Sequence, residues 1–140
     1  MPQNEMNAWD RAGVAASGFC MAHCLALPAM LALLPALTVY DHIADSTHKI
    51  LGLVLVAISL LAFIPGYRRH RAPIVIVLGA FGLGLVLFAA FAGHAWLGEP
   101  GEVALTLTGS CMLIAAHRRN CALCRSCIEG NAAPSASAAA

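Results

Sequence analysis

One uncharged run sets the class of this protein: IVIVLGAFGLGLVLFAAFAGHAWL, at residues 74–97. A helix needs about 20 predominantly apolar residues to cross the hydrocarbon core of a bilayer, and this run is long enough. Three further apolar runs accompany it, at residues 12–38, 50–66 and 103–117. The sequence therefore predicts four membrane-spanning segments.

The overall composition agrees with a membrane protein. Of the 140 residues, 60% are apolar and 11% are charged, whereas a soluble domain carries about twice that charged fraction. The formal net charge of +1 gives no electrostatic reason to expect a nucleic acid partner. The composition excludes a soluble enzyme, and it makes membrane lipids the expected surroundings.

The apolar runs are predicted to be helices rather than strands. Each run is far longer than a barrel strand, and none alternates apolar with polar residues. The predicted connections are short, at Tyr40–His48, Gly66–Pro73 and Gly98–Glu102, so neighbouring helices should run antiparallel. The predicted fold is all-α: a four-helix transmembrane bundle with up-down-up-down topology.

The basic residues are distributed unevenly between the two sides of this topology. Lys49 lies on one side, and the other side holds Arg11, Arg68, Arg69, Arg71, Arg118, Arg119 and Arg125. Cytoplasmic loops of membrane proteins carry the excess of Lys and Arg. We therefore expect both termini in the cytoplasm. A single membrane domain is predicted over residues 1–129, with a Cys-rich end at 118–129 and a disordered low-complexity tail at 130–140.

The first cysteine group is C-M-A-H-C, which places Cys20, His23 and Cys24 inside the first span. Residues four apart on a helix share a face with Cβ atoms about 5–6 Å apart, wider than the about 3.5–4.5 Å of a disulfide. The spacing favours two sulfurs that bind one soft ion. His23 can add an imidazole ligand or accept a thiol proton. The alternative is inert packing, the usual role of a lone cysteine in a membrane helix.

The second group is C-A-L-C-R-S-C, which contains Cys121, Cys124 and Cys127 just beyond the fourth span. A closed zinc site needs four ligands, so three thiols among arginines favour an exchangeable soft metal, because positive charge stabilises thiolate. S-acylation is the alternative for cysteines next to a membrane. Cys111 lies inside the fourth span at a depth close to Cys24. It is either a third thiol of that site or a small core residue.

The remaining histidines are interpreted as solvent-facing or interfacial. The predicted outer connection contains Asp41, His42, Asp45 and His48, for which a solvated loop is favoured over a cation site. His70 lies among arginines at the predicted inner interface. His117 ends the fourth span, which it and the flanking arginines complete by reaching toward the interface.

Three segments of the sequence, G-F-C-M-A-H-C-L-A-L-P-A-M-L-A-L-L-P, G-Y-R-R-H-R and A-H-R-R-N-C, resemble the MerC-type family of four-span inner-membrane proteins. The resemblance covers nearly the whole chain from Ala8 to Cys127. It implies a bacterial inner-membrane location and uptake of mercuric ion. It also implies that the first-span pair Cys20 and Cys24 and two of the C-terminal thiols pass the ion to a cytoplasmic mercuric reductase.

Thiol chemistry favours the same class of cargo. Thiolates select soft ions such as Hg(II) and Cu(I), together with Zn(II), over Mg(II) and Ca(II). A linear ion fits two sulfurs, whereas tetrahedral zinc needs Cys111 or His23 as well. The expected mechanism is a thiol-to-thiol relay that ends on a soluble thiol, without a permanent cofactor. The alternatives are a Cu(I)- or Zn(II)-binding membrane protein, and a thiol-disulfide redox protein or sensor that uses Cys121 and Cys124.

Overall fold

The computed structural model describes residues 3–33 and 41–137 of the chain. Within these ranges every regular element is helical, and no strand is present. The elements are α1 (Gln3–Leu33), α2 (Asp41–His70), α3 (Pro73–Phe88), the π-helical segment η2 (Ala89–Gly93) and α4 (His94–Ser137). The predicted all-α class is therefore confirmed.

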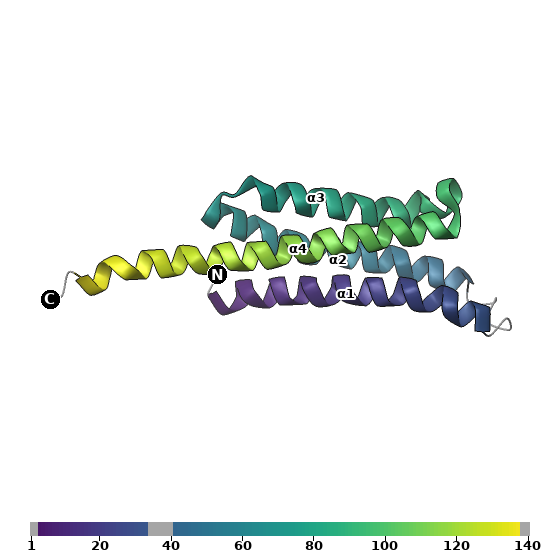
Figure 1. Cartoon of the computed structure of the whole chain (residues 1–140), viewed down its shortest axis with the longest axis horizontal. Coiled ribbons are helices and arrows are strands. Elements are labelled where there is room, and N and C mark those ends of the chain that lie inside the picture. Colours follow the sequence, from purple (N-terminus) through teal and green to yellow (C-terminus); the bar gives the residue numbers. More distant parts are fainter. Residues whose placement is uncertain (1–2, 34–40, 138–140) are drawn as a thin grey trace.

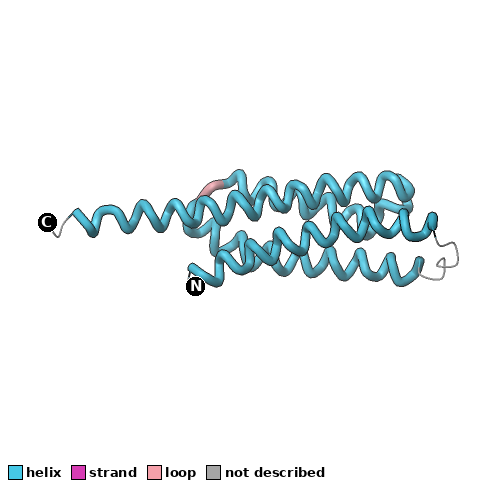
Figure 2. Tube along the Cα trace, turned by 60° about the horizontal axis from the view of Figure 1, so that its bottom comes forward, coloured by secondary structure: helices cyan, strands magenta, loops and turns pink. Residues whose placement is uncertain are grey.

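The helices lie side by side along one axis, and the chain reverses its direction between successive helices (Figure 1). Helix α4 contacts α1, α2 and α3, whereas α1 and α3 make no contact with each other across the described residues. The first residues of α1 and the last residues of α4 lie toward the same end of the bundle (Figure 2). Helix α4 extends beyond the other helices there and reaches Ser137, inside the segment whose composition predicts disorder.

Two of the connections at which the chain reverses lie within the described residues, and each has a characteristic residue. Between α2 and α3, Pro73 begins the new helix at its first turn, where its fixed φ fits the helix and its missing N–H costs nothing. Within α4, Gly98 has a φ of 68° and a ψ of −179°, a conformation that favours glycine. The break at Gly98 coincides with the start of the predicted connection. Residues 99–102, however, are already helical.

Large apolar side chains cover the outside of the bundle, and polar side chains occupy its interior. The exposed set on α2 and α3 includes Ile50, Leu53, Leu60, Leu61, Ile64, Ile74, Val77, Phe81 and Phe88. The buried polar set is Asp10, Ser17, Ser59, Thr106, Ser110, His117 and Asn120. A soluble monomer rarely exposes an apolar surface of this size, whereas a membrane-spanning bundle exposes one to lipid. The polar residues of such a bundle face its interior.

Two segments, Ser46–His70 and Pro73–Gly93, are long and apolar enough to cross a membrane among the residues described. They contain the predicted span at 50–66 and most of the one at 74–97. The predicted runs at 103–117 and 12–33 lie within α4 and α1, and residues 34–38 of the first run are outside the described residues.

Small residues on the buried helix faces allow close packing. Between residues 8 and 26 of α1 the buried positions are three and four residues apart: Asp10, Gly13, Ser17, Cys20 and Cys24. Where α3 meets α4, a Cβ on Gly109 would lie 2.7 Å from the Gly82 carbonyl oxygen. A side chain therefore cannot be accommodated there without a shift of backbone, and the small residues bring the helices together as in other membrane bundles.

Candidate functional site

The thiols of Cys20 and Cys24 lie together on the buried face of α1. Their exposed fractions are 3% and 2%. The two thiols interact with each other, and Ser110 of α4 lies beside Cys20. None of the six cysteines, all of which are described, forms a disulfide. The spacing of four residues has therefore brought two free thiols to one face, as the sequence predicted.

Cys24 also contacts a histidine on α2, which in turn contacts a glutamate on α4. The Cys24 Sγ atom lies 3.6 Å from His48 Nε2, and His48 Nδ1 lies 2.9 Å from Glu102 Oε1. Because a carboxylate accepts hydrogen bonds, Nδ1–H of His48 donates to Glu102. The thiol of Cys24 then donates to the lone pair of Nε2. We call Cys20, His23, Cys24, His48 and Glu102 the thiol cluster.

Three buried polar atoms around the two cysteines have no hydrogen-bond partner among the described residues: Ser17 Oγ, His23 Nε2 and Ser110 Oγ. The ring of His23 stacks near Phe19 at 6.2 Å and meets the ring of His48 edge-on at 5.2 Å. Unsatisfied buried polar groups cost about 1–3 kcal/mol each. Their concentration beside the thiols supports a polar ligand site rather than inert packing.

The thiol cluster is not a complete ligand set as it stands. In the part of the chain that the structure describes, no three His, Cys, Asp or Glu side chains are arranged to hold a metal ion. The structure places Cys20, Cys24 and His23 near one another on α1. It adds His48 and Glu102, which the sequence predicts at the ends of two connections between helices. The interpretation of His48 as a loop residue is therefore wrong, because α2 begins at Asp41 and carries His48 into the bundle.

Cys111 does not join the pair. It is exposed, whereas its neighbour Ser110 is fully buried beside Cys20. Successive residues of a helix are rotated by about 100°, so one of two neighbours on α4 faces α1 and the other faces outward. The sequence predicts a depth in the membrane for Cys111 close to that of Cys24, but depth does not determine which face of the helix a residue occupies.

The C-terminal cysteines all lie on α4, three residues apart. Cys124 is 2% exposed, and Cys121 and Cys127 are partly exposed. Burial and the negative charge of Asp10 together raise the pKa of the Cys124 thiol to about 11, against the opposing effect of Arg69. The expectation that nearby arginines favour thiolate is therefore wrong for Cys124, because loss of hydration outweighs the positive charge.

The two cysteine groups do not meet. On α4, Cys121 lies about three helical turns beyond Ser110, which is about 16 Å at 1.5 Å per residue. Ser110 marks the level of Cys20. Thiol exchange requires direct attack of one sulfur on the atom bound to the other. The structure therefore holds two separate sets of thiols.

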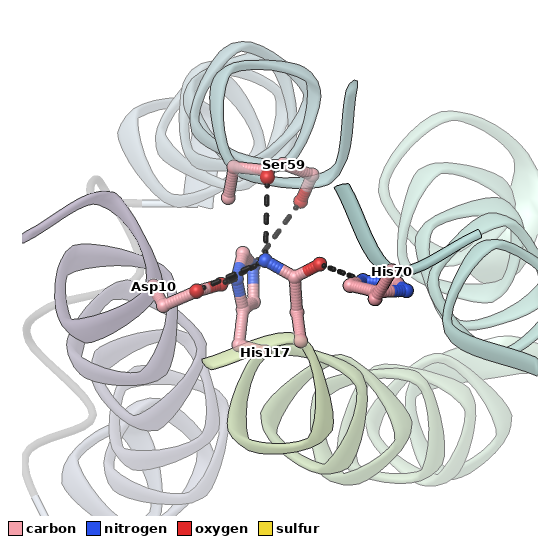
Figure 3. A network of polar contacts seen from close by, with 6 residues as sticks. Asp10, Ser59, His70 and His117 are labelled. Carbon is pink, nitrogen blue, oxygen red and sulfur yellow. Dashed lines mark hydrogen bonds and ion pairs between the residues drawn. The ribbon is translucent and has the colours of Figure 1, made fainter. Parts of the chain in front are cut away.

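A buried polar network lies at the level between them and joins α1, α2 and α4 (Figure 3). His117 Nδ1 lies 3.1 Å from Asp10 Oδ1, and the Asn120 amide donates to both oxygens of Asp10 at 3.1 and 2.9 Å. His117 Nε2 lies 3.5 Å from the hydroxyl of Ser59. We call Asp10, Ser59, His70, His117 and Asn120 the aspartate network.

His70 completes the aspartate network from the end of α2. Its Nδ1 accepts the backbone N–H of Ala72 at 2.9 Å, so its Nε2–H donates to Asn120 Oδ1 at 3.0 Å. The interfacial placement predicted for His117 is wrong, because its ring is fully buried against Phe63 at 4.4 Å. A Cβ on Gly13 would overlap the His117 ring, so the glycine makes the room for it. Sequence reasoning missed Asp10 and Asn120.

Comparison with known proteins identifies one family. The MerC mercury resistance protein family matches residues 10–122, a range that contains the thiol cluster, Cys111, Cys121 and every member of the aspartate network. Neither a search of curated proteins nor a search of solved structures finds a match. The family consists of membrane proteins, is known for resistance and transport rather than catalysis, and implies a role in handling mercury. Since the match covers most of the chain, the protein belongs to the MerC mercury resistance protein family.

Proposed function

We propose that this protein carries mercuric ion across a bacterial inner membrane and that Cys20 and Cys24 bind the ion within the bundle. The observation that supports this most directly is the pair of interacting thiols, buried in a polar interior where Ser17 Oγ and His23 Nε2 have no hydrogen-bond partner among the described residues. Soft thiolate ligands prefer Hg(II) to the hard cations that are abundant in cells. Membership of the MerC family favours mercury among the soft ions.

The proposed topology has four spans, with both termini in the cytoplasm. The lipid-like exterior of α2 and α3 and the reversal of chain direction between successive helices support this arrangement. The end of the bundle where α1 begins and α4 extends carries most of the arginines, among them Arg11, Arg118 and Arg119. Since the cytoplasmic side carries the excess of positive charge, this end is assigned to the cytoplasm. The thiol cluster then lies nearer the outer side.

Transfer of the ion follows thiol exchange. A thiolate of the pair attacks mercury bound to two external thiolates, one mercury–sulfur bond forms, and the other breaks with release of an external thiolate. The cytoplasmic acceptors are Cys121, Cys124 and Cys127, which deliver the ion to a soluble thiol or a mercuric reductase. Because about 16 Å separates the two groups along α4, a diffusible thiol or a movement of the helices must connect them.

Uptake of radioactive mercury by cells tests the proposal. Replacement of both thiols, Cys20→Ser with Cys24→Ser, should reduce uptake to that of cells without the protein, because serine hydroxyls are poor ligands for a soft ion. The exposed thiol of Cys111 supplies a matched control, and Cys111→Ser should leave uptake unchanged. Uptake that persists in the double variant, with the protein present in the membrane at normal amounts, would refute the assigned function.

A further inference from the structure

We propose that His48 is a third protein ligand of the ion bound by Cys20 and Cys24, and that Glu102 orients it. The inference rests on the proposed function and extends it, since the sequence analysis offered His23 and Cys111 as further ligands of the cysteine pair but neither His48 nor Glu102. His48 comes from α2 and Glu102 from α4, so the proposed site is assembled by three helices.

The first argument is the direction in which His48 presents its nitrogen. Glu102 Oε1 accepts Nδ1–H at 2.9 Å, which leaves the lone pair of Nε2 directed at Cys24 Sγ. Histidine ligands in proteins typically donate their second ring N–H to a carboxylate in this way, which fixes the tautomer and the ring orientation. The Glu102–His48 contact thus has the form of a ligand and its orienting group.

The second argument is the separation of the donor atoms. Sulfur at about 2.3 Å and nitrogen at about 2.0–2.1 Å from a tetrahedral ion are about 3.6 Å apart. The observed Cys24 Sγ to His48 Nε2 distance is 3.6 Å, so this pair already has the length of one edge of a tetrahedral site. Cys20, which interacts with Cys24, supplies the other sulfur. Because the three donors do not converge on one point in this conformation, the Cys20 side chain must turn toward the entering ion. The two thiols lose their protons to solvent as the ion binds.

The third argument is the accessibility and surroundings of the pair. The side chains of His48 and Glu102 are 14% and 15% exposed, so they are shielded from bulk water without being sealed. The unpartnered Nε2 of His23 lies in the same cluster, with its ring against that of His48. A site with two sulfurs and one nitrogen accepts four-coordinate borderline ions such as Zn(II) in addition to linear Hg(II), with an external thiol or water in the fourth position.

Cobalt(II) tests this directly, because its absorption spectrum reports both coordination number and sulfur ligation. The parent chain for this test is the full chain purified in detergent with serine in place of four cysteines: Cys111, Cys121, Cys124 and Cys127. In this parent only Cys20 and Cys24 can contribute thiolate bands. We expect one Co(II) per chain, with the absorption of a four-coordinate thiolate site. His48→Ala should weaken Co(II) binding at least tenfold, and Glu102→Gln about tenfold, as for other groups that orient a ligand.

Two further variants separate ligation from folding. Glu99→Gln alters an exposed carboxylate close to Glu102 in sequence and should bind Co(II) as the parent does. His48→Cys restores a soft ligand and should recover binding with an added thiolate band, which a purely structural histidine would not allow. The inference is overturned if the parent chain takes up no Co(II), or if His48→Ala matches the parent in affinity and spectrum.

Mercury binding by the same variants distinguishes the two proposals. Hg(II) is satisfied by two sulfurs, so His48→Ala should retain Hg(II) binding while Cys20→Ser with Cys24→Ser loses it. Co(II) binding that is unchanged in His48→Ala refutes only the third ligand. Undiminished mercury uptake by the double cysteine variant refutes the carrier function itself.

Discussion

The thiol cluster and the aspartate network are built on the same hydrogen-bonding pattern. In each, a histidine on one helix directs Nδ1 at a carboxylate on another and Nε2 at a hydroxyl or thiol on a third element: Glu102–His48–Cys24 in one and Asp10–His117–Ser59 in the other. The difference lies in the surroundings. Asn120 satisfies both oxygens of Asp10, whereas the thiol cluster has unpartnered polar atoms beside it.

This difference indicates distinct roles for one motif. A closed, fully bonded network fixes the relative positions of helices, because each member would be left unsatisfied if a helix moved. A cluster with a polarisable thiol and spare hydrogen-bonding capacity can exchange its internal contacts for contacts with an ion. The aspartate network therefore stabilises the bundle, and the thiol cluster is the part suited to bind.

The largest expected difference between the two sites is in the stability lost when the carboxylate of each is removed. Asp10→Ala removes the buried carboxylate that contacts both His117 and Asn120 and should lower the free energy of unfolding by about 3 kcal/mol. Glu102→Ala affects a partly exposed pair and should cost about 1–2 kcal/mol. Thermal unfolding in detergent, followed by circular dichroism, measures both. Equal losses would remove the structural distinction between the two sites.

Addition of a methyl group to α1 tests how tightly the aspartate network is packed. Gly13→Ala places a Cβ where the His117 ring lies and should destabilise the protein by about 1–3 kcal/mol. Gly18→Ala on the same helix meets no atom within 4 Å and supplies the control. There the higher helix propensity of alanine should leave stability unchanged or raise it by up to about 1 kcal/mol. If Gly13→Ala left the stability unchanged, the His117 ring would not lie against Gly13.

Thiol reactivity distinguishes the buried from the exposed C-terminal cysteines. With a pKa of about 11 in place of 9.0, Cys124 has roughly a hundredfold less thiolate near pH 8, partly offset by the higher nucleophilicity of a more basic thiol. We expect alkylation about tenfold slower than at Cys127. The thiolate fraction rises with pH, so the rate should keep increasing up to about pH 11. Mass spectrometry after timed iodoacetamide treatment measures the alkylation rate of each cysteine. A rate that levels off near pH 9 would contradict the raised pKa.

Two serine substitutions should give the smallest effects. Ser59→Ala removes the hydroxyl that contacts His117 and should cost about 1 kcal/mol. Ser17→Ala removes a buried hydroxyl that has no partner among the described residues and should be neutral or slightly stabilising, because the desolvation penalty disappears with the group. Thermal midpoints of the two variants, compared with the unsubstituted protein, decide the order. A larger loss at Ser17 would mean that this hydroxyl has a partner in the folded protein.

The sequence was sufficient for the helices, the pairing of Cys20 with Cys24 and the family, because each depends on local spacing or on a continuous run of residues. It was not sufficient for the partners of Cys24. His48 and Glu102 are separated from it by 24 residues or more, and only the packing of three helices brings them together. The same applies to Asp10 and Asn120, whose contact spans 110 positions.

The sequence pattern around a residue also did not predict which face of its helix that residue occupies. Cys111 was placed by its depth, and its exposed position follows from rotation about the helix axis. Cys124 was interpreted from its arginine neighbours in sequence, while its ionisation is governed by burial and by Asp10 on another helix. Both cases depend on which helix packs against which face, and this information is absent from a short motif.

The aspartate network also bears on how a cargo could cross. His117, Asn120 and Asp10 are no more than 2% exposed, so the bundle is shut at that level and is not a pore with a continuous aqueous route. An ion that travelled along the axis would have to part the Asp10 carboxylate from its two partners. Passage along the axis and an intact aspartate network are therefore mutually exclusive, and a carrier of the proposed kind would have to open this level of the bundle in each transport cycle.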